Sequence, residues 1–421
     1  MMKTYGLILL FVSLIFSNAF GQVYTTTESS SFRNDSLFKL VKKEKTPFNY
    51  SCEAWAIQTS NTITAGFMNT LAEGGFISRD VLNPILDAHT GPKGYIGATV
   101  GFNISWTSAP NKDRVWSVCG SFGSEAIVDG RWTTDLFELA WYGNASSTGE
   151  VNVLSGSGVR AGVFNRFSIG GYKNDTRQRI ELSLVQRLAG AEWTTPYGYL
   201  YVSENADSVE SYVQSEARLH YGENREFTPA YGIGISGNVP FVPSEFPLEV
   251  NINFKDVGLL FEPEGSRVYW VQDGLTTTGL PVYGDSLTWE SIYDGTVSSD
   301  SVVQTGTSVS RMVLLPAKLG VNLKYKYSDK ISVNGSIYTG GWMPKYLISG
   351  GFEMIHNEDL TWGMNYKDGG WGDSRFEIWA KIKTKHNRVI YVCVEEPAGL
   401  FFREDTGAQT TCRGLALRLE R

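Results

Sequence analysis

The sequence predicts an all-β protein, a transmembrane antiparallel up-and-down β-barrel with a short N-terminal arm or plug. Three observations favour this fold class. The N-terminus has the features of an export signal, the composition combines many glycine and aromatic residues with few charges, and apolar and polar residues alternate over consecutive segments of the C-terminal third. Alternation with a period of two is typical of strands that have two different faces.

The first 21 residues have the features of a cleaved secretory signal peptide. Lys3 precedes an almost wholly apolar run over residues 7–16, and the small residues Ala19 and Gly21 follow at the positions that a signal peptidase reads. The apolar run is too short to cross a bilayer, and no later segment approaches 18 consecutive apolar residues. We therefore expect export through the inner membrane of a Gram-negative bacterium.

The composition narrows the possible functions. The chain has 45 Gly, 21 Tyr, 22 Phe and 12 Trp but only 19% charged residues, which suits strands and the places where strands bend or pack closely. Its formal net charge of -7 argues against a nucleic acid partner. The four cysteines show no CxxC spacing and the four histidines are scattered, so no metal or cofactor is expected. Neither a GxSxG nor an HExxH motif occurs, and we expect no enzyme activity.

The chain beyond the signal peptide is predicted to have two parts. Residues 22–90 are expected to form a periplasmic N-terminal arm or plug, because they are polar and rich in Ser and Thr, with a short helix near residues 78–87. Residues 91–421 are expected to form the barrel. Its first strands are predicted at residues 95–106 and 116–123, where apolar and polar residues alternate.

The C-terminal third is predicted to form seven strands joined as hairpins. In the first strand Leu319 and Leu323 share one face, and Asn322 and Lys324 share the other. The seven segments are residues 319–327, 331–337, 346–355, 360–366, 376–383, 388–394 and 411–421. A soluble sandwich with its polar face in water would alternate in the same way. The length of the series and the aromatic ends of the strands favour the membrane barrel.

The connections between these strands predict an orientation. Single-chain outer-membrane barrels place both termini in the periplasm, with short turns there and longer loops outside. Counted back from the C-terminus, residues 328–330, 356–359 and 385–387 fall on the periplasmic side, and residues 367–374 and 395–409 fall outside.

Two further connections are placed outside by the same count. Residues 342–345 form one of them, although this connection is as short as the periplasmic turns. The other is the Ser/Thr/Asp-rich stretch 266–310, which contains Trp270 and Trp289. This stretch is interpreted as a solvated loop or folded lid, or alternatively as a loop that contacts a ligand or partner.

Cys393 and Cys412 flank the last outer loop and form a candidate disulfide. In a hairpin centred between residues 402 and 403 they lie opposite each other, and both fall on the polar face. The bacterial envelope is oxidising enough for such a bond. The alternative is that both are small unreactive residues. No geometry supports a second bond between Cys52 and Cys119.

Four segments carry a resemblance to a known family. They are DLFELAWYGN (residues 135–144) with the Thr-Gly pair at 148–149, QRIELSLVQRLAG (178–190), NFKDVGLLF (253–261) and LPAKLGVNLKY (315–325). Together they resemble a Bacteroidota family of outer-membrane barrels of unknown function, similar to long-chain fatty-acid transporters and to barrels associated with type IX secretion. The resemblance implies about fourteen strands and a partly plugged lumen. The chain ends on Leu-Glu-Arg, whereas outer-membrane barrels usually end on an aromatic residue.

The predicted function is an integral outer-membrane barrel that passes or binds a small hydrophobic ligand. Trp379 and Tyr391 are candidate ligand contacts, because both are aromatic residues on the predicted lumen face. Outer-membrane lipid is the expected surrounding. Two alternatives are open. One is a structural or accessory barrel that grips an envelope or secretion-system protein, and the other is a soluble secreted β-sandwich or adhesin.

Overall fold

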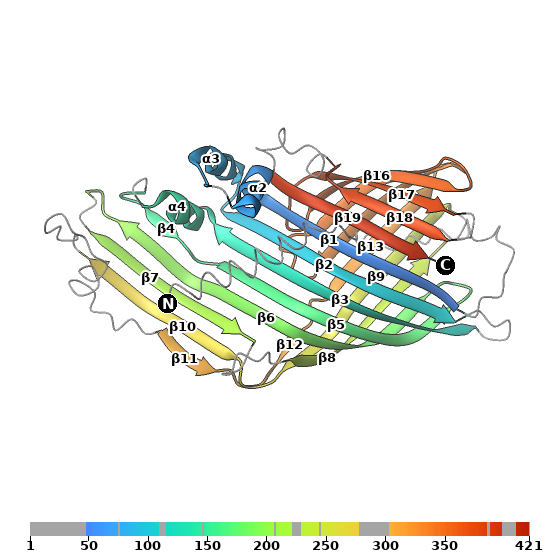
Figure 1. The fold of residues 1–421 in the computed structure, drawn as a ribbon, viewed down its shortest axis with the longest axis horizontal. Helices are drawn as coiled ribbons and strands as arrows, with labels where there is room; N and C mark the ends of the chain where they lie inside the picture. The colour runs from blue at the N-terminus through green and yellow to red at the C-terminus, as the bar shows by residue number, and fades with distance from the viewer. Residues whose placement is uncertain are drawn as a thin grey trace.

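A computed structural model shows one large antiparallel β-sheet that closes on itself (Figure 1). The structure describes residues 48–74, 76–108, 115–144, 147–205, 208–220, 229–243, 246–277, 303–384, 388–397 and 410–420. The predicted signal peptide, the first half of the predicted arm and the predicted turn at 385–387 lie outside the described residues.

Within the part of the chain that the structure describes, fourteen strands form the closed barrel, as the family resemblance implied. In their order around the barrel they are β1 (Phe48–Thr64), β2 (Lys93–Ser108), β3 (Trp116–Thr133), β5 (Ser157–Lys173), β6 (Arg179–Val202), β8 (Ala230–Phe241), β9 (Leu248–Glu262), β13 (Lys318–Lys326), β14 (Ile331–Gly340), β15 (Leu347–Ile355), β16 (Leu360–Gly369), β17 (Arg375–Lys383), β18 (Val389–Glu395) and β19 (Thr410–Glu420). Pairing of β1 with β19, in which Ala54 lies opposite Leu417, closes the ring. Closure satisfies the backbone groups that an open sheet would leave at its edges.

The predicted seven-strand meander is confirmed. Strands β13 to β19 follow one another in the sheet in sequence order, and each pairs antiparallel with the next. The predicted short turns at residues 328–330 and 356–359 both lie at one end of the barrel, and the connections at 342–345 and 370–374 lie at the other. The alternation of side chains is therefore a sufficient local signal for these strands.

The predicted boundary of the barrel at residue 91 is wrong. Residues 48–64, assigned to a periplasmic arm, form β1, which pairs with both β19 and β2. The outward-facing side chains of this strand include Cys52, Ala54 and Ala56, which are small, while its inward-facing side chains are mostly polar. The strand consequently lacks the bulky apolar face by which the other strands are recognised.

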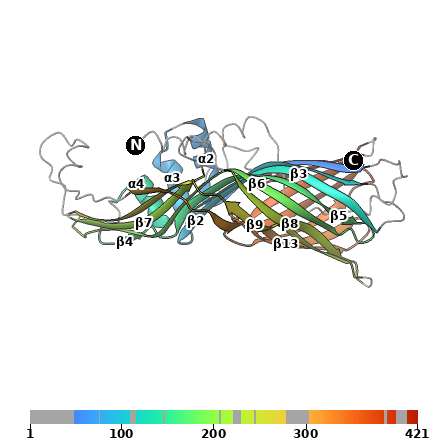
Figure 2. The same ribbon diagram turned by 90° about the horizontal axis from the view of Figure 1, so that it is seen from below.

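A smaller sheet projects from one end of the barrel (Figures 1 and 2). It arises because β6, with 24 residues, is longer than the barrel wall. The first part of β6, up to Arg187, pairs with β8, and the part beyond it pairs with β7. Strand β10 pairs with β7, and β11 pairs with β10. The strands outside the closed ring are β4 (Val151–Val153), β7 (Val209–Leu219), β10 (Arg267–Thr277), β11 (Val303–Thr307) and β12 (Arg311–Leu314). We call β7, β10, β11 and the second half of β6 the extension.

The extension corrects the prediction of one long loop over residues 266–310. Both ends of this stretch are strands, β10 and β11, and residues 278–302 lie outside the described residues. Trp270 lies within β10, where it is opposite Glu216 of β7. Strand β10 is stabilised by its pairing with β7, a long-range partner that no local pattern reveals.

Among the described residues, three helices lie at the same end of the barrel as the extension. They are α2 (Ala65–Glu73), α3 (Arg79–Ala88) and α4 (Thr134–Tyr142), and α3 confirms the helix predicted near residues 78–87. Thr64 and Thr133 cap α2 and α4, since their hydroxyls accept hydrogen bonds from backbone N–H groups in the first turn. The helices pack through a buried cluster that includes Phe67, Ile85 and Phe137. None of the helices in the described part of the chain is long and apolar enough to cross a membrane. We call this end of the barrel the helix end and the opposite end the turn end.

The barrel strands expose their apolar side chains and bury their polar ones. On β6, Leu182 and Leu184 are 55% and 57% exposed, whereas Ser183 between them is 1% exposed. On β17, Phe376 and Ile378 are exposed and Glu377 between them is fully buried. A soluble sandwich has the reverse polarity and two packed sheets. The alternative of a soluble β-sandwich is therefore wrong, because one closed sheet carries an apolar exterior.

Exposed aromatic side chains form two rows on the outside of the barrel, one near each end. The row near the turn end consists of Tyr50, Trp116, Phe241, Phe246, Tyr325 and Tyr327. The row near the helix end consists of Tyr231, Phe261, Tyr346, Tyr366 and Phe376. Between the rows the exposed side chains are mainly Leu, Ile and Val. An apolar band between two aromatic rows matches the polarity profile of a lipid bilayer.

Candidate functional site

The lumen of the barrel is divided into levels, and β3 shows their order. From the turn end to the helix end, the inward-facing residues of this strand are Ser121, Gly123, Glu125, Ile127, Asp129 and Arg131. The first two line a polar cavity, and Glu125 belongs to a charged cluster. Ile127 belongs to an apolar layer, and the last two line another cavity at the helix end. A solute crossing the lumen meets each level in turn.

Two adjoining cavities of about 290 and 200 Å³ occupy the turn-end half of the lumen. Both are lined by Arg179, Glu181 and Arg418, and the larger one also reaches Trp55 and Tyr338. Arg179 donates to Glu181 over 2.8 Å. The Nε atoms of Arg179 and Arg418 are buried without a hydrogen-bond partner in the described structure. Because unpaired buried donors are costly, these two arginines favour a bound water or polar ligand.

A cluster of five charged side chains lies between these cavities and the apolar layer. Glu125 contacts Arg166 of β5 at 2.9 Å. Lys255 of β9 and Lys318 of β13 reach the same carboxylate at 3.1 and 3.3 Å. Arg166 also donates through Nε to Asp256 at 2.5 Å. Since β3 and β13 are far apart around the ring, these contacts cross the lumen, and each buried charge has an opposite partner.

Asp256 enters this cluster because of an irregularity in β9. Its φ of 54° is in the left-handed region, which is uncommon for a residue other than glycine. At this point β9 changes its partner from β13 to β12, and the register of β8 shifts opposite it. The irregularity turns the carboxylate inward, where it is 1% exposed. Its ion pair with Arg166 offsets a backbone cost of about 1 kcal/mol or more.

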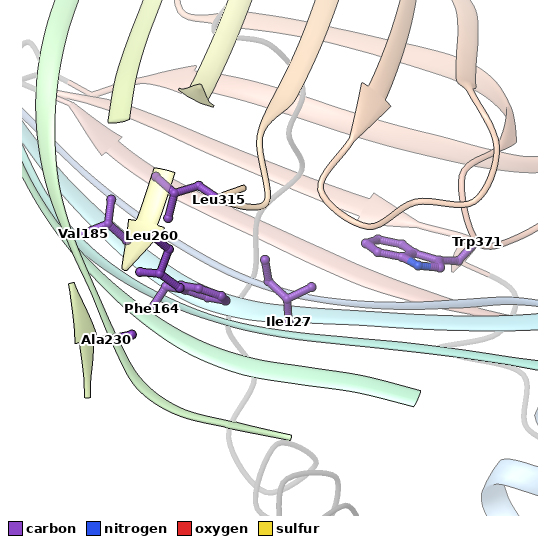
Figure 3. Close-up of a cluster of buried hydrophobic side chains, with 7 residues drawn as sticks. All are labelled: Ile127, Phe164, Val185, Ala230, Leu260, Leu315 and Trp371. Atoms are coloured by element: carbon purple, nitrogen blue, oxygen red, sulfur yellow. The ribbon is translucent and has the colours of Figure 1, made fainter. Parts of the chain in front are cut away.

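An apolar layer fills the lumen on the helix-end side of the charged cluster. Six of its side chains come from the barrel wall and the segment before β13, and each is at most 3% exposed: Ile127, Phe164, Val185, Ala230, Leu260 and Leu315. Figure 3 shows Phe164, Leu260 and Leu315 close together, with Ile127 between them and Trp371. Apolar constrictions exclude ions and water, so this layer opposes free passage of polar solutes.

Trp371 completes the apolar layer from the connection between β16 and β17. It is 8% exposed, and its indole N–H donates to Asp129 of β3 over 2.9 Å. The indole lies flat against Gly97 of β2, where an added Cβ would come within 1.9 Å of the ring. Gly97 is therefore the residue that allows this tryptophan to approach the opposite wall so closely.

A second tryptophan, Trp342, packs on the layer from the connection between β14 and β15. Its ring centroid is 5.9 Å from that of Phe164, and the guanidinium of Arg160 lies 5.1 Å above it. Arg160 in turn donates to Asp129 at 2.8 Å. Asp129 thus contacts Trp371 directly and Trp342 through Arg160. These contacts stabilise the connection between β16 and β17 and the connection between β14 and β15 in positions inside the lumen.

A further group of buried ion pairs lines the wall formed by β16, β17 and β18. Lys367 contacts both Glu377 and Glu395, and Arg375 donates to Glu395 over 3.3 Å. All four residues are at most 6% exposed. Because these strands are neighbours and both acids are paired with cations, the group joins adjacent strands of the wall.

The two predicted ligand contacts, Trp379 and Tyr391, lie together on the lumen side of β17 and β18. Their ring centroids are 5.7 Å apart, and Trp379 packs against Cys393 and Ala416 with 8% exposure. Neither residue lines the two turn-end cavities. The structure brings the two residues into contact, and their role in ligand contact stays a prediction.

The predicted pairing of Cys393 with Cys412 is wrong in register. Cys393 lies opposite Ala416, and Glu395 lies opposite Gly414, which centres the hairpin between residues 404 and 405. This displaces Cys412 by four residues from the position opposite Cys393. No disulfide bond joins the four cysteines, all of which lie in the described residues, and Cys393 and Cys412 are both buried. The register follows from inter-strand pairing along the whole wall, which the spacing of the cysteines does not determine.

The charged residues that divide the lumen are not among the predicted site residues. The strand predicted at residues 116–123 ends before Glu125 and Asp129, and Arg166 lies in β5, where no strand is predicted. Charged residues at every second position of a membrane-length strand are the signal that could have located them. Asp256 had no such signal, because its inward position depends on the irregularity of β9.

Within the part of the chain that the structure describes, no group of three or more His, Cys, Asp or Glu side chains could hold a metal ion. The acidic residues of the lumen that were described above are instead paired with Arg and Lys. Such pairing makes them counter-charges for basic side chains.

No known sequence family and no curated protein matches this chain. Its fold is similar to that of solved outer-membrane barrels. The TodX deltaS2S3 mutant monoaromatic hydrocarbon channel has 10% identity and a TM-score of 0.45, with 94% of each chain covered. The Pseudomonas putida toluene transporter TodX has 10% identity and a TM-score of 0.39, with 94% of this chain and 93% of that chain covered. A mutant porin of Rh. blastica has 9% identity and a TM-score of 0.26, over 89% of this chain and 99% of the porin. At these identities and TM-scores, nothing further about this chain is inferred from the likeness.

Proposed function

We propose that this chain is an integral protein of a Gram-negative outer membrane, with its helix end outside. Its exposed apolar band, its two aromatic rows and its closed sheet support this proposal. In a bilayer every backbone polar group must be satisfied within the protein, which a closed barrel achieves. The predicted signal peptide supports export, and the short turns at the opposite end support a periplasmic turn end.

The membrane proposal is tested by extraction and gel migration of the full chain. We expect the protein to require detergent and to migrate differently before and after boiling, because a closed barrel resists unfolding by detergent at room temperature. A protein that stays in the aqueous phase and migrates identically in both samples would contradict the proposal.

We further propose that the barrel passes or binds a small hydrophobic ligand. The observation that carries this proposal is the apolar layer across an otherwise polar lumen. A pore for hydrophilic solutes has a polar, water-filled lumen, whereas this layer disfavours water and ions. An apolar ligand gains about 25 cal/mol for each Å² of its surface that leaves water, so the same layer favours its binding.

Uptake by intact cells tests this function. The lipopolysaccharide layer of the outer membrane slows the entry of apolar compounds into the cell, so a channel for them should raise the rate of uptake. We expect a host that expresses the chain to take up toluene faster than the same host without it, and its purified protein to give no swelling of liposomes in glucose. Leu260→Asn places a polar group in the apolar layer and should abolish the gain, while Glu358→Asn in an exposed turn should preserve it. Rapid liposome swelling in glucose without faster toluene uptake would show an open polar pore and refute the function.

An accessory role is the second candidate, and the extension favours it. The extension projects beyond the barrel and exposes large aromatic side chains, including Trp193, Tyr197 and Trp270. Aromatic residues of this kind are enriched in protein interfaces. A stoichiometric envelope or secretion-system protein that co-purifies with the chain, and is lost with Trp193→Ser, would support this role. Membership of the Bacteroidota family likewise remains a proposal, which rests on the four sequence segments, and no catalytic activity is proposed.

A further inference from the structure

A third cavity, of about 410 Å³, lies at the helix end of the lumen. We call it the vestibule. Its lining comes from β2, β3 and β5 on one wall and from the connection between β14 and β15 on the opposite wall. On β3 it begins at Asp129, the next inward position after Ile127 of the apolar layer. A solute that approaches from the helix end would therefore meet the vestibule before the apolar layer.

The vestibule has an excess of positive charge. Lys93, Arg131 and Arg160 line it together with one carboxylate, that of Asp129. This carboxylate is occupied, because it accepts hydrogen bonds from Arg160 at 2.8 Å and from the indole of Trp371 at 2.9 Å. The side chains of Lys93 and Arg131 form no ion pair or hydrogen bond with any residue that the structure describes. Two cations thus face the cavity without a counter-charge, which attracts an anion.

The vestibule also has apolar and aromatic lining. Tyr95 lies two residues from Lys93 on β2, and Trp342 and Met343 line the opposite wall and also pack on the apolar layer. The vestibule therefore adjoins the apolar layer through these two shared side chains. A ligand that satisfies the whole cavity needs a negative group for the cations and a flat apolar body for the aromatic side chains.

We propose that the vestibule binds an aromatic carboxylate. The carboxylate pairs with Arg131 and Lys93, and the ring lies against Tyr95 and Trp342. The planar guanidinium of Arg131 matches the two oxygens of a carboxylate, and aromatic rings pair favourably edge to face or offset. A neutral arene would leave both cations unpaired, and an inorganic anion would leave the aromatic wall in water. The inference rests on the proposed function only in taking the vestibule as the entrance of the channel.

Equilibrium binding to the detergent-extracted full chain tests this inference, with benzoate and benzamide as probes. The two probes have nearly the same shape, but only benzoate is charged. We expect benzoate to bind roughly 10-fold more tightly than benzamide, as hydrogen bonds to charged groups imply. Arg131→Gln and Lys93→Gln should each weaken benzoate roughly 10-fold and leave benzamide unchanged. The matched control Lys330→Gln removes a lysine from a turn at the opposite end of the barrel and should change neither.

Three outcomes would overturn the inference. Benzamide could bind as tightly as benzoate, the Arg131→Gln variant could retain full benzoate affinity, or inorganic phosphate could displace benzoate at equal concentration, which would make the vestibule a site for any small anion. Gel migration before and after boiling establishes that each variant is folded. Faster toluene uptake without selective benzoate binding would refute this inference alone, and selective benzoate binding without toluene uptake would refute the proposed function alone.

Discussion

Removal of Trp371 should open the lumen. The side chain is 8% exposed and hydrogen-bonded to Asp129, and it belongs to a connection whose other residues do not pair as strands. Replacing a buried tryptophan by alanine costs about 3–5 kcal/mol. The substitution Trp371→Ala therefore destabilises the conformation in which the connection lies inside the lumen. The ion pair between Asp129 and Arg160 remains in this variant. The population with the connection displaced should therefore rise by roughly two to four orders of magnitude.

Conductance of single proteins in planar bilayers measures this change. We expect the wild type to conduct little in potassium chloride and Trp371→Ala to show frequent openings. Trp371→Phe keeps most of the apolar volume and loses only the hydrogen bond to Asp129, so it should raise the open population roughly 10-fold. Gly97→Val tests the same contact from the other wall, since its side chain would occupy the position of the indole, and it should resemble Trp371→Ala.

A folded Trp371→Ala variant with wild-type conductance would refute this reasoning. It would mean that another level, such as the charged cluster around Glu125 and Arg166, closes the lumen without help from the apolar layer.

Three other predictions concern stability. Leu182→Arg places a charge in the exposed apolar band and should lower the free energy of unfolding from lipid vesicles by about 2–4 kcal/mol, measured by urea titration. Glu395→Ala removes the carboxylate that pairs with Lys367 and Arg375 and should cost about 3–5 kcal/mol in the same titration. Burial lowers the pKa of His89 at the end of α3, so the unfolded state takes up a proton first as the pH falls. The protection of α3 against hydrogen exchange should therefore be constant above about pH 6.5 and decrease below it.

Matched variants separate these effects from general damage. Leu182→Ala should cost much less than Leu182→Arg, and Glu358→Ala in an exposed turn should leave stability unchanged. His89→Gln should remove the pH dependence of protection in α3. Equal costs for the two Leu182 variants, a neutral Glu395→Ala, or a pH dependence that persists in His89→Gln would each contradict the corresponding prediction.

The outer wall of the barrel was largely predictable from the sequence. Leu319 and Leu323 on one face of β13, with Asn322 and Lys324 on the other, specify a strand without reference to any partner. The same pattern recurs in the six strands that follow, so each strand of the meander can be predicted from its own residues. Strand β1 is not predicted from the sequence, because outward-facing residues such as Ala54 are too small to form a recognisable apolar face.

The interior was much less predictable, because its contacts join distant strands. Glu125 and Lys318 are 193 residues apart in the chain, and Trp371 is 242 residues from Asp129. The inward orientation predicted for Trp379 and Tyr391 follows from the alternation along each strand. Alternation does not determine the level of the barrel at which a side chain lies, and the cavities and the apolar layer depend on that level.

The sequence by itself determined that this chain is built of strands with one apolar and one polar face, because that property belongs to each strand alone. Only the tertiary structure decided which face is inside. Closure of the sheet through β1 and β19 placed Glu125, Arg166 and Asp256 in the lumen and the leucines outside. The tertiary structure also decided the register that separates Cys393 from Cys412, and it brought Trp371 to Asp129. Each of these features depends on which strands pair and in what register. The alternation along one strand is the same whichever strands pair with it, so it carries no information about pairing or register.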